Sequence, residues 1–254
     1  MNTSSIGLPS ASCQRTKEPG APPEDAAWKS LYRVAGVAAL ITVLLIPVQA
    51  IVFIAWPPPS TVIDHFTLFQ SNKLLGLLSL DLLYLVDNAL LIPIFLALYV
   101  ALRRHGESLM AIGTTLGLMG IVALFASNTA FSMLPLSDQY AAATSEAQKA
   151  MLLAAGQAML ATYTGTAYQV SYVLGSIAGI VVSAVMLRSS IFSKATGYMG
   201  VLAFVLGLGL YVPTIGAYIA LISVIPFLAI WYILIARRLF QLERVVSKEE
   251  ANRN

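Results

Sequence analysis

The sequence has little charge and few of the residues that usually carry chemistry. Charged residues make up 11% of the 254 residues, whereas hydrophobic residues make up 58%. Soluble domains contain about 25% charged residues. This composition excludes an ordinary soluble domain and predicts an all-α, polytopic membrane protein whose main partner is the lipid bilayer.

Cysteine and histidine are too scarce for the common metal and redox sites. Cys13 is the one cysteine, so an intrachain disulfide and a thiolate metal site are excluded. His65 and His105 lie outside the apolar runs, which argues against a haem or zinc site inside the membrane. Nucleophile–base spacings and phosphate-binding loops are also missing. We therefore expect no metal and no cofactor, and the sequence argues against an enzyme without excluding one.

Six apolar segments are long enough to cross a bilayer, since about 20 residues at 1.5 Å each span its hydrocarbon core. Residues 1–27 are predicted to be a disordered cytoplasmic tail, 28–242 a six-transmembrane-helix bundle, and 243–254 a charged cytoplasmic tail. Two shorter segments, 61–72 and 146–162, are predicted to lie at the extracytoplasmic interface, the second as an extra interfacial or partly re-entrant helix. The expected membrane helices are 28–56, 73–104, 108–134, 166–187, 195–212 and 217–239.

The basic residues predict the orientation. With a cytoplasmic N-terminus, all of the 15 Lys and Arg residues except Lys73 and Lys149 fall on the cytoplasmic side. Such a bias matches the positive-inside rule. It predicts a multi-pass protein of the plasma membrane with both termini cytoplasmic. It also accounts for the isoelectric point near 9.0 without a nucleic-acid partner.

The second expected membrane helix, 73–104, carries acidic residues, and this is the main functional clue. An Asp at a helix centre costs about 2.5–3.5 kcal/mol on insertion, so these acids need partners in the folded bundle. On a helical wheel four of its polar residues share one arc, and no Lys, Arg or His lies deep in any span to form a buried ion pair. The candidate ligand- or proton-binding residues are Asp81, Tyr84, Asp87 and Asn88, with Asn128 of the third helix as a partner.

Several functions fit this pattern. The first is binding or transport of a proton, a cation or a small amphipathic ligand at the acidic face. The second is a non-catalytic membrane subunit or regulator that binds a partner protein, with the acids serving as hydrogen-bonded packing contacts. Two GxxxG patterns, at Gly113/Gly117 and Gly175/Gly179, allow close helix packing within the bundle or in a homodimer.

Two stretches carry a resemblance to a known family. They are LLSLDLLYLVDNALLIPIFLALYVALRR in the second expected helix and RSSIFSKATGYMG between the fourth and fifth. With the order of the elements, they resemble domain of unknown function 4386, an uncharacterised family of prokaryotic multi-pass membrane proteins. The resemblance covers about residues 28–242. It implies a fold and a membrane location, and it implies no activity.

Overall fold

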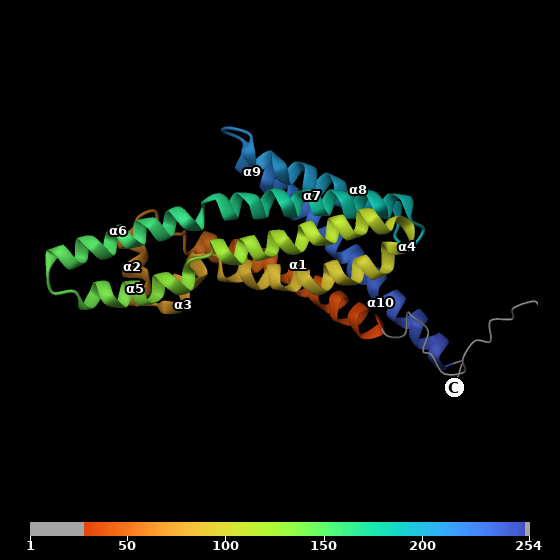
Figure 1. The fold of residues 1–254 in the computed structure, drawn as a ribbon, viewed down its shortest axis with the longest axis horizontal. Helices are drawn as coiled ribbons and strands as arrows, with labels where there is room; N and C mark the ends of the chain where they lie inside the picture. The colour runs from red at the N-terminus through yellow and green to blue at the C-terminus, as the bar shows by residue number, and fades with distance from the viewer. Residues whose placement is uncertain (1–27, 252–254) are drawn as a thin grey trace, which may run out of the picture.

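The computed structural model describes residues 28–251, and all of their regular structure is helical (Figure 1). The predicted N-terminal tail, 1–27, lies outside the described residues. The helices are α1 (Lys29–Ala55), α2 (Val62–Ser71), α3 (Lys73–Ser79), α4 (Leu82–Ser127), α5 (Ala130–Ala142), α6 (Glu146–Tyr163), α7 (Thr166–Arg188), α8 (Lys194–Leu208), η2 (Gly209–Tyr211), α9 (Gly216–Ile222), η3 (Ser223–Leu228) and α10 (Ala229–Ala251). The prediction of an all-α protein is confirmed for this part of the chain.

The single label α4 covers two antiparallel helices. Helical geometry fails at Gly106, where the sequence predicted a turn. An ideal Cβ at Gly117 would lie 2.6 Å from the ring of Phe95, and these two residues are equally distant from Gly106 in sequence. The two halves of α4 therefore fold back on each other and pack closely.

The main bundle consists of α1, α4, α7, α8 and α10. In it α4 packs against α7, α1 against α10 and α7 against α8. Its outer surface is apolar as well, with Leu44 and Val122 about two-thirds exposed. Among the described residues, five helical segments are long and apolar enough to cross a membrane. Fully buried residues of its core include Leu98, Leu102, Met110, Val182, Met186, Ile235 and Leu239.

A second group of helices, α2, α3, α5 and α6, extends from one end of the bundle (Figure 1). We call it the distal cluster. It has a separate hydrophobic core that includes Phe66, Phe69 and Met133. In the same view α6 continues the direction of α7, and it packs against α5 and α2. The position of α6 as an interfacial or partly re-entrant helix stays a prediction.

Other predicted boundaries also change. The second expected membrane helix is broken between Ser79 and Leu82, and the third ends at Ser127 before α5 begins. The last expected helix contains a π-helical stretch around Pro226, where proline removes a backbone donor. It continues helically to Ala251, so most of the predicted charged tail is helical.

Three of the four GxxxG glycines pack inside the chain. An ideal Cβ would lie 3.1 Å from Val181 at Gly113, 2.6 Å from Phe95 at Gly117 and 2.3 Å from Phe204 at Gly179. At Gly175, by contrast, no described atom lies within 4 Å of that position. Packing within the bundle thus accounts for Gly113, Gly117 and Gly179. A homodimer contact through Gly175 stays a prediction.

The two glycines of the second pattern make a matched pair of variants. Gly179→Ala places a methyl group inside the Phe204 ring, and overpacking of this kind costs about 1–3 kcal/mol. Gly175→Ala has space and should gain about 0.5–1 kcal/mol from the better helix propensity of alanine. Thermal unfolding in detergent should therefore show a lower Tm for the first variant and an equal or higher Tm for the second. A lower Tm or a loss of dimer for Gly175→Ala would indicate that a second chain covers this face.

Candidate functional site

The chain breaks at Asp81, between α3 and α4. Asp81 has φ 61° and ψ 35°, which is the left-handed region. This conformation costs most residues about 1–2 kcal/mol, and aspartate adopts it only occasionally. Asp81 therefore occupies the N-cap position of α4, without a side-chain capping hydrogen bond, instead of lying within a continuous helix. The helical wheel of the sequence does not apply to it, because no single helix contains both Asp81 and Asp87.

Asn128 stabilises this break. Its Nδ2 donates to the carbonyl of Leu80 over 2.8 Å, and its Oδ1 accepts from the backbone N–H of Ala130 over 3.0 Å. One side chain thus pairs backbone groups at two helix breaks, between α3 and α4 and between α4 and α5. The sequence predicted that Asn128 would contact an acidic side chain. In the structure, its hydrogen bonds are to these two backbone groups instead.

The carboxyl group of Asp81 joins three helices. Gln49 of α1 donates from Nε2 to Oδ1 over 3.3 Å, and the Tyr163 hydroxyl of α6 donates to Oδ2. The sequence did not indicate Tyr163, because nothing in the local pattern relates the end of α6 to a residue more than 80 positions earlier.

Asp81 lies in a cavity of about 430 Å³ between the bundle and the distal cluster. Its walls come from α1, the loop after α1, α2, the α3–α4 break and α6. Among the described residues that line it, Asp81 is the one acidic residue, and no Lys or Arg lines it. The lining residues are Phe53, Pro58, Pro59, Ser60, His65, Ser79, Leu80, Asp81, Gln157, Leu160, Ala161, Tyr163 and Thr164.

Two titratable groups of this cavity are affected by burial. Burial lowers the pKa of His65, while the Pro59 carbonyl and the Asp64 carboxylate oppose that shift. His65 is 4% exposed, and its Nδ1 has no hydrogen-bond partner among the residues that the structure describes. Burial also raises the pKa of Asp81, and the hydrogen bonds from Tyr163 and Gln49 lower it in part. The cavity is thus lined by a buried histidine and by a carboxyl group with capacity for further hydrogen bonds.

The remaining predicted site residues lie deeper in α4. Asn88 donates from Nδ2 to the carbonyl of Tyr84 over 2.9 Å, which is a local contact within the helix. Asp87 lies beside Thr42 of α1. The buried Oδ1 of Asp87 and Oγ1 of Thr42 have no hydrogen-bond partner in the described part of the chain. The structure therefore separates the predicted site into a cavity around Asp81 and a deeper position around Asp87.

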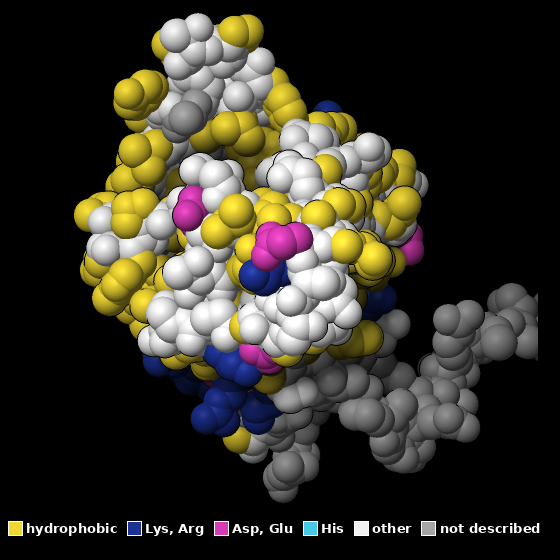
Figure 2. Space-filling view, turned by 90° about the vertical axis from the view of Figure 1, so that its left-hand side faces the viewer, with side chains coloured by type: hydrophobic (Ala, Val, Ile, Leu, Met, Phe, Trp, Pro, Cys, Tyr) yellow, Lys and Arg dark blue, Asp and Glu magenta, His cyan; other side chains and the backbone are white. Residues whose placement is uncertain are grey.

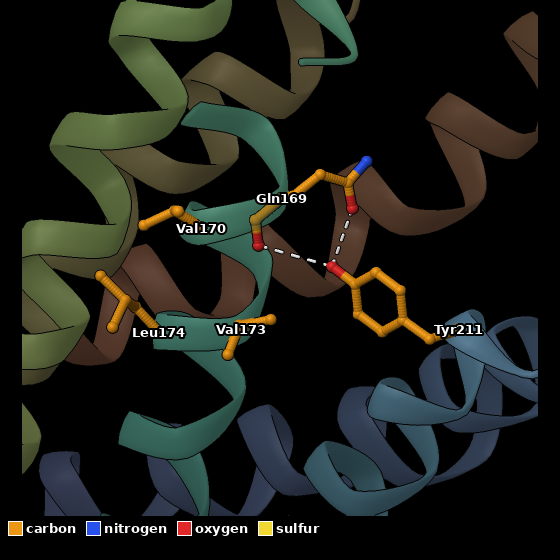
Figure 3. Close-up of a pocket in the computed structure, with 5 residues that line it drawn as sticks. All are labelled: Gln169, Val170, Val173, Leu174 and Tyr211. Atoms are coloured by element: carbon orange, nitrogen blue, oxygen red, sulfur yellow. Dashed lines mark hydrogen bonds between the residues drawn. The ribbon is translucent and has the colours of Figure 1, made fainter. Parts of the chain in front are cut away.

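A larger groove of about 650 Å³ runs along α7 beside η2 (Figure 3). It is lined by Gln169, Val170, Val173, Leu174 and Tyr211. The Tyr211 hydroxyl donates to Gln169 Oε1 over 2.9 Å across its polar end. The other lining residues, Val170, Val173 and Leu174, are aliphatic, so they provide no group that could act as an acid, a base or a nucleophile.

Neither region resembles a metal centre. Within residues 28–251, no group of three or more His, Cys, Asp or Glu side chains is placed to hold a metal ion. The sequence matches no protein-family model, and no curated protein or solved structure gave a significant match. Membership of domain of unknown function 4386 therefore stays a prediction.

The buried His65 gives the unfolding free energy a defined pH dependence. Its pKa is lowered in the folded protein, so the unfolded chain binds the proton more readily below the unfolded pKa of about 6.5. The contribution of the neutral His65 to the free energy of unfolding is fully present above that pH, and it is lost as the pH falls towards the folded pKa. We expect His65→Gln to lose less stability than wild type between pH 8 and pH 5 in thermal unfolding. The exposed His105→Gln serves as the control, and an identical loss in wild type and His65→Gln would contradict this environment.

Proposed function

We propose that the protein is a six-crossing protein of the plasma membrane that binds or transports a proton, a cation or a small amphipathic ligand through the Asp81 cavity. Five long apolar segments support the membrane location. One of them, Leu82–Ala142, contains the reversal at Gly106, and this fold-back supports a sixth crossing. The bilayer would then surround the main bundle.

The arrangement of the helix ends supports cytoplasmic termini. The start of α1, the Gly106 turn, the α7–α8 turn and the end of α10 lie towards one end of the bundle, opposite the distal cluster (Figure 1). Most described Lys and Arg residues belong to that first end. The two exceptions lie in the distal cluster, where Lys73 pairs with Asp138 and Lys149 with Glu146. By the positive-inside rule, the distal cluster and its cavity would be extracytoplasmic.

The observation that carries the proposal is the position of Asp81. Its carboxyl group lies in a cavity, at a break between helices, in a backbone conformation that costs free energy. Strain of this kind is concentrated at functional sites. A carboxyl group that lines a cavity provides an anchor for a cation or a proton, and the apolar walls suit the rest of an amphipathic molecule.

The position of Asp87, deeper along α4, supports transport in addition to binding. Asp87 follows Asp81 by six residues along α4, which corresponds to about 9 Å of helix. Its carboxyl group lies beside the Thr42 hydroxyl, and within the described part of the chain its buried Oδ1 makes no well-formed hydrogen bond. A proton or cation released from the cavity would find acceptors there. Binding alone requires only the outer position.

A second function is favoured by the surface of the distal cluster. Seen from that end, hydrophobic side chains cover much of the face, and a small group of acidic and basic side chains lies near its middle (Figure 2). Phe131 of α5 and Met151 of α6 are 62% and 70% exposed. Exposed apolar side chains on a projecting pair of helices suit a partner protein. The protein would then be a non-catalytic membrane subunit or regulator.

Cysteine labelling tests the cavity and its orientation together. In a Cys13→Ser background, Gln157→Cys places a thiol on the cavity wall, and Ala154→Cys places one on an exposed part of α6. Membrane-impermeant thiosulfonate reagents, one cationic and one anionic, are added to intact cells. We expect both thiols to react from outside, and the cationic reagent to gain roughly 10-fold over the anionic one at Gln157→Cys because a carboxylate raises the local cation concentration.

Asp81→Asn provides the decisive control, because it retains the shape and the tolerance for the left-handed conformation. It should abolish the cation preference at Gln157→Cys and leave the ratio at Ala154→Cys unchanged. A preference that persists in Asp81→Asn would contradict the cation site. Labelling of either thiol only after permeabilisation would contradict the orientation.

A further inference from the structure

We propose that the Asp81 cavity binds a small organic ammonium ion, specifically a primary or secondary amine with an apolar or aromatic body. This inference rests on the proposed function and names its ligand class. It depends on the charge, the size and the hydrogen-bonding groups of the cavity.

The charge of the walls selects a cation. Asp81 is the one acidic side chain among the described lining residues, and no Lys or Arg shares the cavity. A carboxylic or phosphoric ligand would therefore meet a carboxyl group without a compensating positive charge. A cationic head next to Asp81 instead gains a charge-assisted hydrogen bond.

The size of the cavity favours an organic cation over an inorganic one. Its volume of about 430 Å³ lies within the range of about 300–1,000 Å³ that is typical of small-molecule sites. Calcium takes 6–8 oxygen ligands, and here the walls provide a single carboxyl group. A bare ion would leave most of the space unfilled, whereas an amine with an apolar body would fill it.

The polar groups distinguish an N–H-bearing amine from a quaternary one. Asp81 already accepts hydrogen bonds from Gln49 and Tyr163, but each carboxylate oxygen can accept another. His65 lines the same cavity, and its buried Nδ1 has no hydrogen-bond partner among the described residues. An unpaired buried polar group is unfavourable. A primary or secondary ammonium has N–H groups that can donate to acceptors of this kind, whereas a quaternary ammonium has none.

Aromatic and apolar walls complete the site. Phe53 of α1 and Tyr163 of α6 both line the cavity. Ring faces attract cations and also pack against hydrocarbon. Pro58, Pro59 and Leu160 add further apolar surface. The site therefore matches a compact amphipathic cation.

The test uses the full chain in lipid nanodiscs with 2-phenylethylammonium as the probe. Three compounds accompany it: the uncharged 2-phenylethanol, the quaternary N,N,N-trimethyl analogue and sodium chloride at equal ionic strength. Binding is measured by calorimetry and by the shift in Tm. We expect the primary amine to bind about tenfold more tightly than its quaternary analogue and the alcohol to show no measurable binding, since a charged hydrogen bond contributes about 1.5–3 kcal/mol.

Three variants locate the binding. Asp81→Asn should weaken the primary amine at least tenfold, and His65→Gln should reduce its advantage over the quaternary amine. Asp138→Asn changes an exposed carboxylate of the distal cluster that does not line the cavity, so it should bind like wild type. Should Asp81→Asn fail to fold, the loss of discrimination in His65→Gln still tests the site.

The negative results distinguish the amine site from the proposed function. Equal binding of the amine to wild type and Asp81→Asn would overturn the inference. Stabilisation by sodium that depends on Asp81, without amine binding, would also overturn it and leave the proposed cation site in place. The absence of any Asp81-dependent binding, together with no cation preference in the labelling experiment, would contradict the proposed function as well.

Discussion

The hydrogen-bonded carboxyl group of Asp81 connects the two parts of this protein. It accepts from Gln49 in the bundle and from Tyr163 at the end of α6. Buried polar groups of this kind must be paired, because an unsatisfied group costs about 1–3 kcal/mol. The contact thereby fixes where the distal cluster meets the bundle. The cavity lies at this junction, so its shape depends on the same contact.

The break in the chain and the cavity have a common cause. A continuous helix through 73–104 would leave Asp81 within an apolar span at a cost of about 2.5–3.5 kcal/mol. The left-handed conformation of Asp81 separates α3 from α4 instead, and Asn128 pairs the Leu80 carbonyl at this point. α3 then packs with α2 and α5. Asp81 therefore lies at the N-cap of α4 and not within an apolar helix.

The apolar runs of the sequence predicted the helices of the bundle well, because a span of α1 or α7 is specified by its own composition. The break at Asp81 and the docking of α6 depend on Tyr163, Gln49 and Asn128, which are far apart in sequence. Local periodicity contains no information about such pairs. For this reason the sequence did not predict the helix break at Asp81 or the contacts of its carboxyl group. Asp87 and Asn88, which the sequence placed with Asp81, lie along α4, where Asn88 donates to the Tyr84 carbonyl and Asp87 lies beside Thr42.

A double-mutant cycle between Asp81 and Tyr163 tests the central claim most directly. The free energy of unfolding in mixed micelles is measured for wild type, Asp81→Ala, Tyr163→Phe and the double variant, so that the backbone strain of Asp81→Ala cancels in the cycle. Residues in direct contact show coupling energies of about 0.5–3 kcal/mol, and distant residues add within about 0.3–0.5 kcal/mol. We predict a coupling of at least about 1 kcal/mol, as expected for a hydrogen bond to a charged group. Additive effects would show that α6 does not dock on Asp81, and the cavity would then have to be abandoned.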